Sequence, residues 1–236
     1  MSQSSEIVES TGSATLTSGE AAAPRGLLLL GQTRRDYHNL PEHWGALGEL
    51  FRGAGLSQRW ITDDVSALEP GFLRRFDVIL NYSTRLEPAS EQVGHLVHAV
   101  EQGVGYVGLH AASATFLTNP AYLQMLGAQL HGHPPIKRFT VEFVDRDHPI
   151  TSGLERYDHE DERYELTGDL TDPKHMLPVG DVRVLAVAEG HPMVYVKQHG
   201  AGRVVYLASG HDRRSLDHPT YRMLFNRAIA WAAQRL

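Results

Sequence analysis

The chain has 236 residues, 42% of them hydrophobic, which is enough for the core of one large α/β domain. Its 22 Lys and Arg against 28 Asp and Glu give a formal net charge of -6 without a basic block to neutralise phosphates, so nucleic acid is excluded as a partner. The absence of Cys excludes disulfides, thiolate metal sites and cysteine nucleophiles.

The N-terminal segment differs in composition from the rest. Residues 1–24 are rich in Ser, Thr, Glu and Ala and lack the basic start and apolar run of a signal peptide. We therefore expect a disordered tail over residues 1–24 and one α/β domain over residues 25–236. No later apolar stretch approaches the roughly 20 residues of a membrane helix. These features predict a cytoplasmic protein without membrane contact.

Short apolar runs alternate with helical patterns through the first half of the chain. The expected strands cover residues 26–30, 57–61, 78–80 and 106–109. Apolar residues recur at i, i+3, i+4 and i+7 over residues 47–54 and 93–100, which is the spacing of amphipathic helices. The pattern therefore predicts strands and helices in alternation.

The second half changes character before it returns to this alternation. Between residues 139 and 198, apolar runs follow one another without helices, so we expect an antiparallel β addition that covers one side of a crevice. A strand over 204–208 and a long apolar stripe over 221–232 then close the chain. The whole predicts a doubly wound parallel sheet, which binds ligands outside the carboxyl ends of its strands.

Polar side chains follow the expected parallel strands. The first strand is followed by His38 and the third by Tyr82 and Ser83, whereas His110 and His211 come directly after the fourth strand and the late one. Because the carboxyl ends of parallel strands share one edge of a sheet, we predict that these side chains assemble one site. Histidine suits both proton transfer near neutral pH and metal ligation.

His110 stands where a strand enters a turn of small residues, over 108–112. This pattern is typical of a nucleophile elbow, in which small neighbours permit a strained and exposed residue at the turn. A histidine there acts as a base or as a metal ligand. The alternative is a histidine that is simply hydrogen-bonded under a loop.

Three further segments carry candidates whose alternatives stay open. Asp212 either hydrogen-bonds its neighbour His211 or caps a turn. The pair His131 and His133 has a spacing that suits a metal in a strand but is common in plain loops. The acidic run 159–164 is a solvated loop unless one of its carboxylates reaches the crevice.

Several short motifs occur in a fixed order along the chain. They are Tyr37-His38, residues 108–113, His148-Pro149-Ile150 with Gly153-Leu154, Asp161-Glu162 with Tyr164, residues 196–203, Gly210-His211-Asp212 and residues 227–233. Together they resemble the trehalose-utilisation (ThuA-like) family. The resemblance implies a class I glutamine amidotransferase-like, flavodoxin-like fold and a role in the catabolism of trehalose and related glycosides through 3-keto sugars. Amidotransferases place a Cys nucleophile where this chain has His110, so thioester chemistry is excluded.

On this basis we predict an enzyme that removes the proton beside the carbonyl of a keto-sugar or 3-keto-glycoside, with elimination, hydrolysis or isomerisation to follow. The predicted catalytic residues are His110, Glu162 and His211. The predicted substrate-binding residues are His38, Ser83, His133, Tyr164 and Asp212.

Two other functions stay open on the same residues. His38, His110, His211 and Glu162 would also suit a divalent metal ion such as Zn, which makes a metal-assisted hydrolase an alternative. A non-catalytic sugar-binding or regulatory protein is the other. We expect a small-molecule sugar as ligand, no nucleotide or flavin, and leave open whether the chain forms a homo-oligomer.

Overall fold

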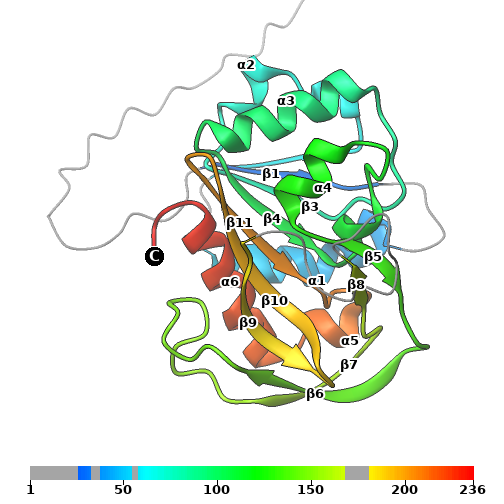
Figure 1. Ribbon diagram of the computed structural model, residues 1–236, viewed down its shortest axis with the longest axis vertical. Helices are drawn as coiled ribbons and strands as arrows, with labels where there is room; N and C mark the ends of the chain where they lie inside the picture. Colours follow the sequence, from blue (N-terminus) through cyan, green and yellow to red (C-terminus); the bar gives the residue numbers. More distant parts are fainter. Residues whose placement is uncertain (1–25, 33–37, 55–57, 168–180) are drawn as a thin grey trace, which may run out of the picture.

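The computed structural model describes residues 26–32, 38–54, 58–167 and 181–236. The expected tail over residues 1–24 and Tyr37 of the family motif lie outside these ranges. Within them, a nine-stranded mixed sheet runs through the molecule between layers of helices, and a separate two-stranded sheet lies beside it (Figure 1). None of the helices in the described ranges combines the length and hydrophobicity that crossing a membrane requires.

One half of the large sheet is parallel, with the strand order β2-β1-β3-β4-β11. These strands are β1 (Gly26–Leu30), β2 (Gln58–Thr62), β3 (Val78–Asn81), β4 (Gly105–Leu109) and β11 (Gly202–Leu207). Every residue of β1, β3 and β4 is buried, which explains their nearly unbroken apolar sequences. The order is that of flavodoxin-like folds, so the predicted doubly wound sheet is confirmed.

The helices cover both faces of this parallel half. Helix α1 (Leu40–Gly53) connects β1 to β2, and α3 (Ser90–Glu101) connects β3 to β4 in the opposite direction along the sheet. Because such crossovers are right-handed, α1 and α3 lie on opposite faces. Helix α6 (Pro219–Ala232) packs with α1, and α4 (Pro120–Leu126) packs with α3. The remaining helical segments are Val65–Ala67, α2 (Pro70–Leu73), His110–Ala114 and α5 (Arg213–Leu216).

The other half of the sheet is antiparallel. Strands β10 (His191–His199), β9 (Arg183–Ala188), β6 (Lys137–Phe143) and β7 (Tyr157–Asp161) continue outward from β11 in that order. The predicted antiparallel addition is therefore confirmed, and it extends the main sheet. The separate sheet pairs β5 (Gln129–Gly132) with β8 (Glu165–Thr167).

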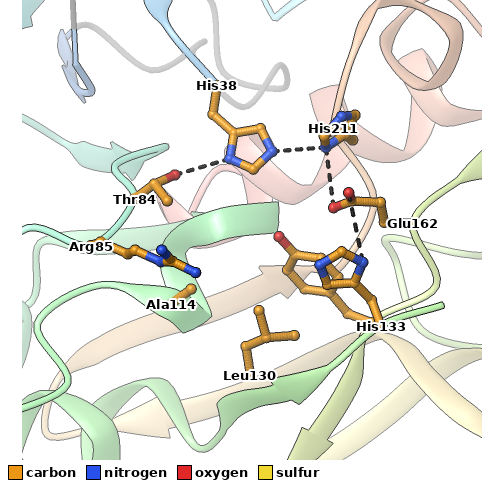
Figure 2. A pocket seen from close by; sticks show the side chains of 9 residues that line it. His38, Thr84, Arg85, Ala114, Leu130, His133, Glu162 and His211 are labelled. Atoms are coloured by element: carbon orange, nitrogen blue, oxygen red, sulfur yellow. Dashed lines mark hydrogen bonds and ion pairs between the residues drawn. The ribbon is translucent and has the colours of Figure 1, made fainter. Parts of the chain in front are cut away.

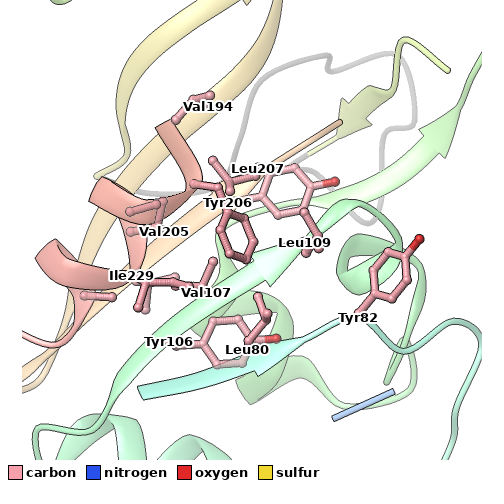
Figure 3. Packing of buried hydrophobic residues seen from close by; sticks show 14 of the residues in the cluster. Leu80, Tyr82, Tyr106, Val107, Leu109, Val194, Val205, Tyr206, Leu207 and Ile229 are labelled. Carbon is pink, nitrogen blue, oxygen red and sulfur yellow. The ribbon is translucent and has the colours of Figure 1, made fainter. Parts of the chain in front are cut away.

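Close packing on α6 fixes the centre of the sheet. Figure 3 shows Val107 and Leu109 of β4, Val205 and Leu207 of β11 and Ile229 of α6 in one buried cluster. At the start of β4, a Cβ on Gly105 would lie only 2.3 Å from the carbonyl oxygen of Ala232 in α6. The helix backbone thus rests directly on the strand, which holds β4 and the turn that follows it in place.

Candidate active site

A cavity of about 380 Å³ lies at the carboxyl ends of the parallel strands (Figure 2). It borders the point between β1 and β3 where the strand order reverses, which is where such folds bind ligands. Its lining consists of His38, Thr84, Arg85, Ala114, Leu130, His133, Glu162, Tyr164 and His211. The turns after β1, β3 and β11 therefore share this cavity with segments that flank the small sheet.

Two histidines from distant segments meet at one wall of the cavity. The Nε2 atom of His38 lies 2.9 Å from Nδ1 of His211, and Nδ1 of His38 lies 3.0 Å from the hydroxyl of Thr84. Burial and the neighbouring imidazoles of His110 and His211 lower the pKa of His38 to about 2. The His38 ring is consequently neutral at physiological pH, so one of its two nitrogens carries a lone pair.

His110 is held beneath this wall in a strained backbone conformation. Its φ of 46° lies in the left-handed region, which confirms the predicted strained turn. Its Nδ1 lies 2.7 Å from the carbonyl oxygen of Ala208, so Nδ1 carries the proton. The expectation of an exposed side chain is wrong, because Tyr164 stacks on the ring at 4.0 Å and His38 covers its edge at 4.7 Å.

The Nε2 atom of His110 points away from that hydrogen bond and has no hydrogen-bond partner among the described residues. It lies 3.4 Å from Oε2 of Glu162. An unpaired buried nitrogen is costly unless a ligand completes it. Both alternatives for His110 therefore describe part of the finding: one nitrogen is hydrogen-bonded, and the other faces the site.

Glu162 follows β7 and brings a carboxylate to the histidines. Its Oε2 lies 3.1 Å from Nδ1 of His211, and its Oε1 lies 3.6 Å from Nδ1 of His133. Burial alone would raise the pKa of Glu162, but the imidazoles of His110 and His211 hold it well below its usual range. Burial would likewise lower the pKa of His211, but the Glu162 carboxylate raises it. Each of these two side chains therefore stabilises the charged form of the other.

Four of these side chains have the composition of a metal site. His38, His110, His211 and Glu162 each offer one ligand atom, and these atoms all lie within 4.8 Å of one another. Imidazole nitrogens with one carboxylate oxygen suit divalent transition-metal ions. A ring whose second nitrogen donates to a backbone carbonyl, as in His110, is the usual arrangement of a metal-ligating histidine. The residues present therefore fit a divalent ion.

Comparisons with known proteins identify the family of this chain. The ThuA family, described as trehalose utilisation, matches residues 27–232. The chain belongs to this family. The class I glutamine amidotransferase-like fold expected from the sequence motifs is consistent with that membership. No curated protein sequence matches the chain.

Solved structures share the fold of this ThuA family member over most of its length. A ThuA-like protein from Parabacteroides merdae has 18% identity and a TM-score of 0.73, covering 89% of this chain and 90% of that one. A second, from Bacteroides uniformis, has 22% identity and a TM-score of 0.71 over 93% and 94%. A protein from Salmonella typhimurium described as cytoplasmic has 12% identity and a TM-score of 0.62 over 87% and 98%.

Several sequence candidates of the ThuA-family chain lie outside the cavity lining, as far as the described residues define it, and His110 is one of them because Tyr164 and His38 cover its ring. Ser83 is fully buried and donates a hydrogen bond to Oδ1 of Asn81. Asp212 accepts the backbone N–H of Arg214 at 2.8 Å and caps α5. Of the two alternatives that the sequence left open for Asp212, the structure therefore shows the cap. His131 is exposed and does not reach the cavity, although its neighbour His133 does.

Sequence reasoning missed Thr84, Arg85 and Asp161. Thr84 and Arg85 directly follow Ser83 in the chain. The sequence therefore correctly placed site residues after this strand, but it selected the buried Ser83 in place of its two neighbours that line the cavity. Arg85 has a φ of 49°, a second left-handed backbone at the cavity. Asp161 is a buried carboxylate at the end of β7. It lies on the same inward face of the strand as Tyr157 and His159, at every second position. That period-two pattern was the available signal.

Proposed function

We propose that the chain is a cytoplasmic enzyme of carbohydrate catabolism that acts on a keto-sugar or 3-keto-glycoside. We further propose that the metal cluster, defined as His38, His110, His211 and Glu162, binds a divalent ion such as Zn. The main observation that supports this proposal is that these ligand atoms lie within 4.8 Å of one another at the wall of a cavity of about 380 Å³. Membership in a trehalose-utilisation family supports a sugar as the substrate.

The chemistry of a keto-sugar matches what the cavity offers. A ketone at C3 acidifies the hydrogen at C2, and the enediolate formed on its removal needs positive charge at its oxygen. A divalent ion in the metal cluster supplies that charge when it is bound. Leu130 and Tyr164 add apolar surface to the lining of the cavity.

The proton at C2 is assigned to Oε1 of Glu162. This carboxylate is a weak base because, despite burial, the imidazoles lower its pKa, so the transfer relies on the ketone and on the positive charge that a bound divalent ion would supply to acidify the C2 hydrogen. Glu162 directs Oε2 toward His110 and His211, whereas Oε1 lies toward His133 on the other side of the carboxylate. His133 lies beside Oε1, with its Nδ1 3.6 Å from that oxygen and 3.1 Å from the carbonyl oxygen of Pro134. In an elimination, the electron pair of the broken C2–H bond forms a C1=C2 double bond and expels the substituent at C1, which takes a proton from water. In an isomerisation, Glu162 returns the proton to C3 and the proton of the C2 hydroxyl moves to the oxygen at C3, so that C2 becomes the carbonyl carbon.

Metal-assisted hydrolysis is the second candidate, because three imidazoles and one carboxylate are also a donor set that activates water. The two reactions treat the C2 hydrogen differently. Proton removal exchanges it with solvent, whereas direct attack of water at C1 leaves it in place.

The test incubates a 3-keto-glycoside with the metal-free protein and with the protein reloaded with Zn²⁺ or Co²⁺, in D₂O, and follows C2 by NMR. We expect turnover only with metal, together with loss of the C2 proton signal. Turnover with C2 retained would identify the hydrolase, and saturable binding without turnover would identify a sugar-binding protein. Light scattering on the same samples tests whether the chain forms a homo-oligomer.

A further inference from the structure

Asp161 is a buried carboxylate directly behind the metal cluster, with 1% of its surface exposed. Its Oδ2 accepts the backbone N–H of Gly210 at 2.7 Å, the hydroxyl of Ser215 at 2.5 Å and the backbone N–H of His211 at 3.5 Å. Its Oδ1 accepts the backbone N–H of Glu162 at 2.6 Å. One side chain thus binds the backbone of two members of the metal cluster.

These hydrogen bonds connect two segments whose strands are not neighbours in the sheet. Glu162 follows β7 at the outer edge of the antiparallel half, whereas His211 follows β11 in the middle of the sheet. Strands β10, β9 and β6 separate the two, so β-pairing does not set the position of Glu162 relative to His211. The hydrogen bonds of Asp161 connect the two segments directly.

The turn that Asp161 holds is pressed against a third member of the cluster. Gly210 has a φ of 138°, and a Cβ at this position would lie 3.3 Å from Cβ of His110 and 3.0 Å from Cδ1 of Leu109. From the other side, the hydroxyl of Tyr82 donates to the carbonyl of Gly210 at 2.7 Å. The turn therefore has little freedom, and its hydrogen bond to Asp161 is one of the contacts that fix the position of His211 relative to His110.

We propose that Asp161 is the positioning residue of the metal cluster: its carboxylate holds Glu162 and His211 at ligand distance from each other. This rests on the proposed metal site, because positioning matters only if both side chains bind the same ion. Partners that orient metal ligands typically change metal affinity by about 10- to 100-fold when they are replaced.

Asp161→Asn is the decisive variant because it keeps the size of the side chain. Its amide has one acceptor oxygen in place of two, so its NH₂ group must face either the N–H of Glu162 or the N–H of Gly210. Ser215→Ala is the matched control. It removes one hydrogen bond from Asp161 and leaves every bond to the backbone of the metal ligands intact.

The experiment loads metal-free full-length wild type, Asp161→Asn and Ser215→Ala with Co²⁺, and measures the affinity and the visible absorption spectrum. Circular dichroism first establishes a temperature at which all three are folded. We expect Asp161→Asn to bind Co²⁺ at least 10-fold more weakly with a changed spectrum, and Ser215→Ala to stay close to wild type in both. Wild-type affinity and spectrum in folded Asp161→Asn would overturn the proposal. If that variant does not fold, Asp161→Ser replaces it, because it places no amide N–H against Gly210.

A wild type that binds no Co²⁺ would contradict the metal part of the proposed function and leave a separate test for Asp161. Imidazole ¹⁵N signals report the position and partners of each histidine ring without any metal. We then expect the His211 signals to move in Asp161→Asn and to stay in place in Ser215→Ala. Unchanged His211 signals in Asp161→Asn would overturn the role of Asp161 as well.

Discussion

The two halves of the sheet contribute different chemistry to the site. The parallel half supplies three imidazoles, His38, His110 and His211, each from the turn that follows a strand. The antiparallel half supplies the carboxylate of Glu162, which follows β7. Parallel topology brings strand ends together by itself, whereas the position of Glu162 depends on side-chain contacts such as those of Asp161. The fold therefore brings the three histidines to one edge of the sheet, whereas the carboxylate reaches them through local packing.

The largest effect is expected where the parallel half is most constrained. His110→Ala removes a nitrogen of the metal cluster, so we expect loss of the bound metal and of turnover on a 3-keto-glycoside. It also leaves the carbonyl of Ala208 without its hydrogen bond, which we expect to cost about 1–3 kcal/mol of unfolding free energy. Urea unfolding in the presence of chelator measures this loss of unfolding free energy without the contribution of the metal.

His98→Ala is the control for that experiment, because His98 lies on the exposed face of α3, away from the cavity. His110→Gln separates chemistry from structure, since it keeps hydrogen-bonding capacity but loses the imidazole. Retention of both metal and turnover in His110→Ala and His110→Gln would contradict the assignment of His110 to the cluster.

The next effect tests whether the antiparallel half is needed for the ion. Glu162→Gln keeps the shape of the side chain and removes its charge, so we expect Co²⁺ affinity to fall by more than the roughly 100-fold upper range for partners outside the ligand set. We expect kcat to stay low even when the metal site is saturated, because the same carboxylate is assigned the C2 proton. The measurement is kcat at saturating metal. Turnover that recovers fully with excess metal would show that Glu162 is a ligand only.

The contrast between the halves also marks what the sequence could predict. Strand-end positions of His38, His110 and His211 followed from apolar runs and the rule that parallel strands end at one edge. Burial of His110 was not predictable, because the residue that covers it, Tyr164, lies 54 positions later in the chain. Ser83 and Thr84 are adjacent, and which one reaches the cavity depends on the hydrogen bond of Ser83 to Asn81. Non-local packing decided the first miss, and a hydrogen bond between near neighbours in the chain decided the second.

A smaller effect is expected just past the cluster in the parallel half. Asp212 caps α5, so Asp212→Ala should cost about 0.5–2 kcal/mol of unfolding free energy, whereas Asp212→Asn keeps a capping oxygen and should cost much less. We expect KM for the keto-sugar to stay the same in both variants. A rise of KM in both, without loss of stability, would instead support the sequence-based prediction that Asp212 binds substrate.

The smallest expected effect concerns the contact that joins the antiparallel half to α6. His148, in the loop between β6 and β7, is buried against Trp231 of α6 with ring centroids 5.1 Å apart, and its Nδ1 accepts the backbone N–H of Ile150 at 3.2 Å. That hydrogen bond requires an unprotonated Nδ1. Burial, reinforced by the charge of Arg183 and opposed by that of Asp145, lowers the pKa of His148 below 6.5.

The sign of the resulting pH dependence follows from proton binding. Below pH 6.5 the unfolded chain takes up a proton at His148 that the folded chain resists, so the folded protein loses stability as the pH falls, by at most about 1.4 kcal/mol per pH unit from this group. His148→Asn keeps an acceptor for Ile150 and cannot titrate. Urea unfolding with chelator at pH 5 to 7 should therefore show a shallower slope in His148→Asn than in wild type. Some slope remains, because burial lowers the pKa of His43 as well. Equal slopes would mean that the junction with α6 tolerates a charged imidazole, and that the two halves are joined less tightly than their packing indicates.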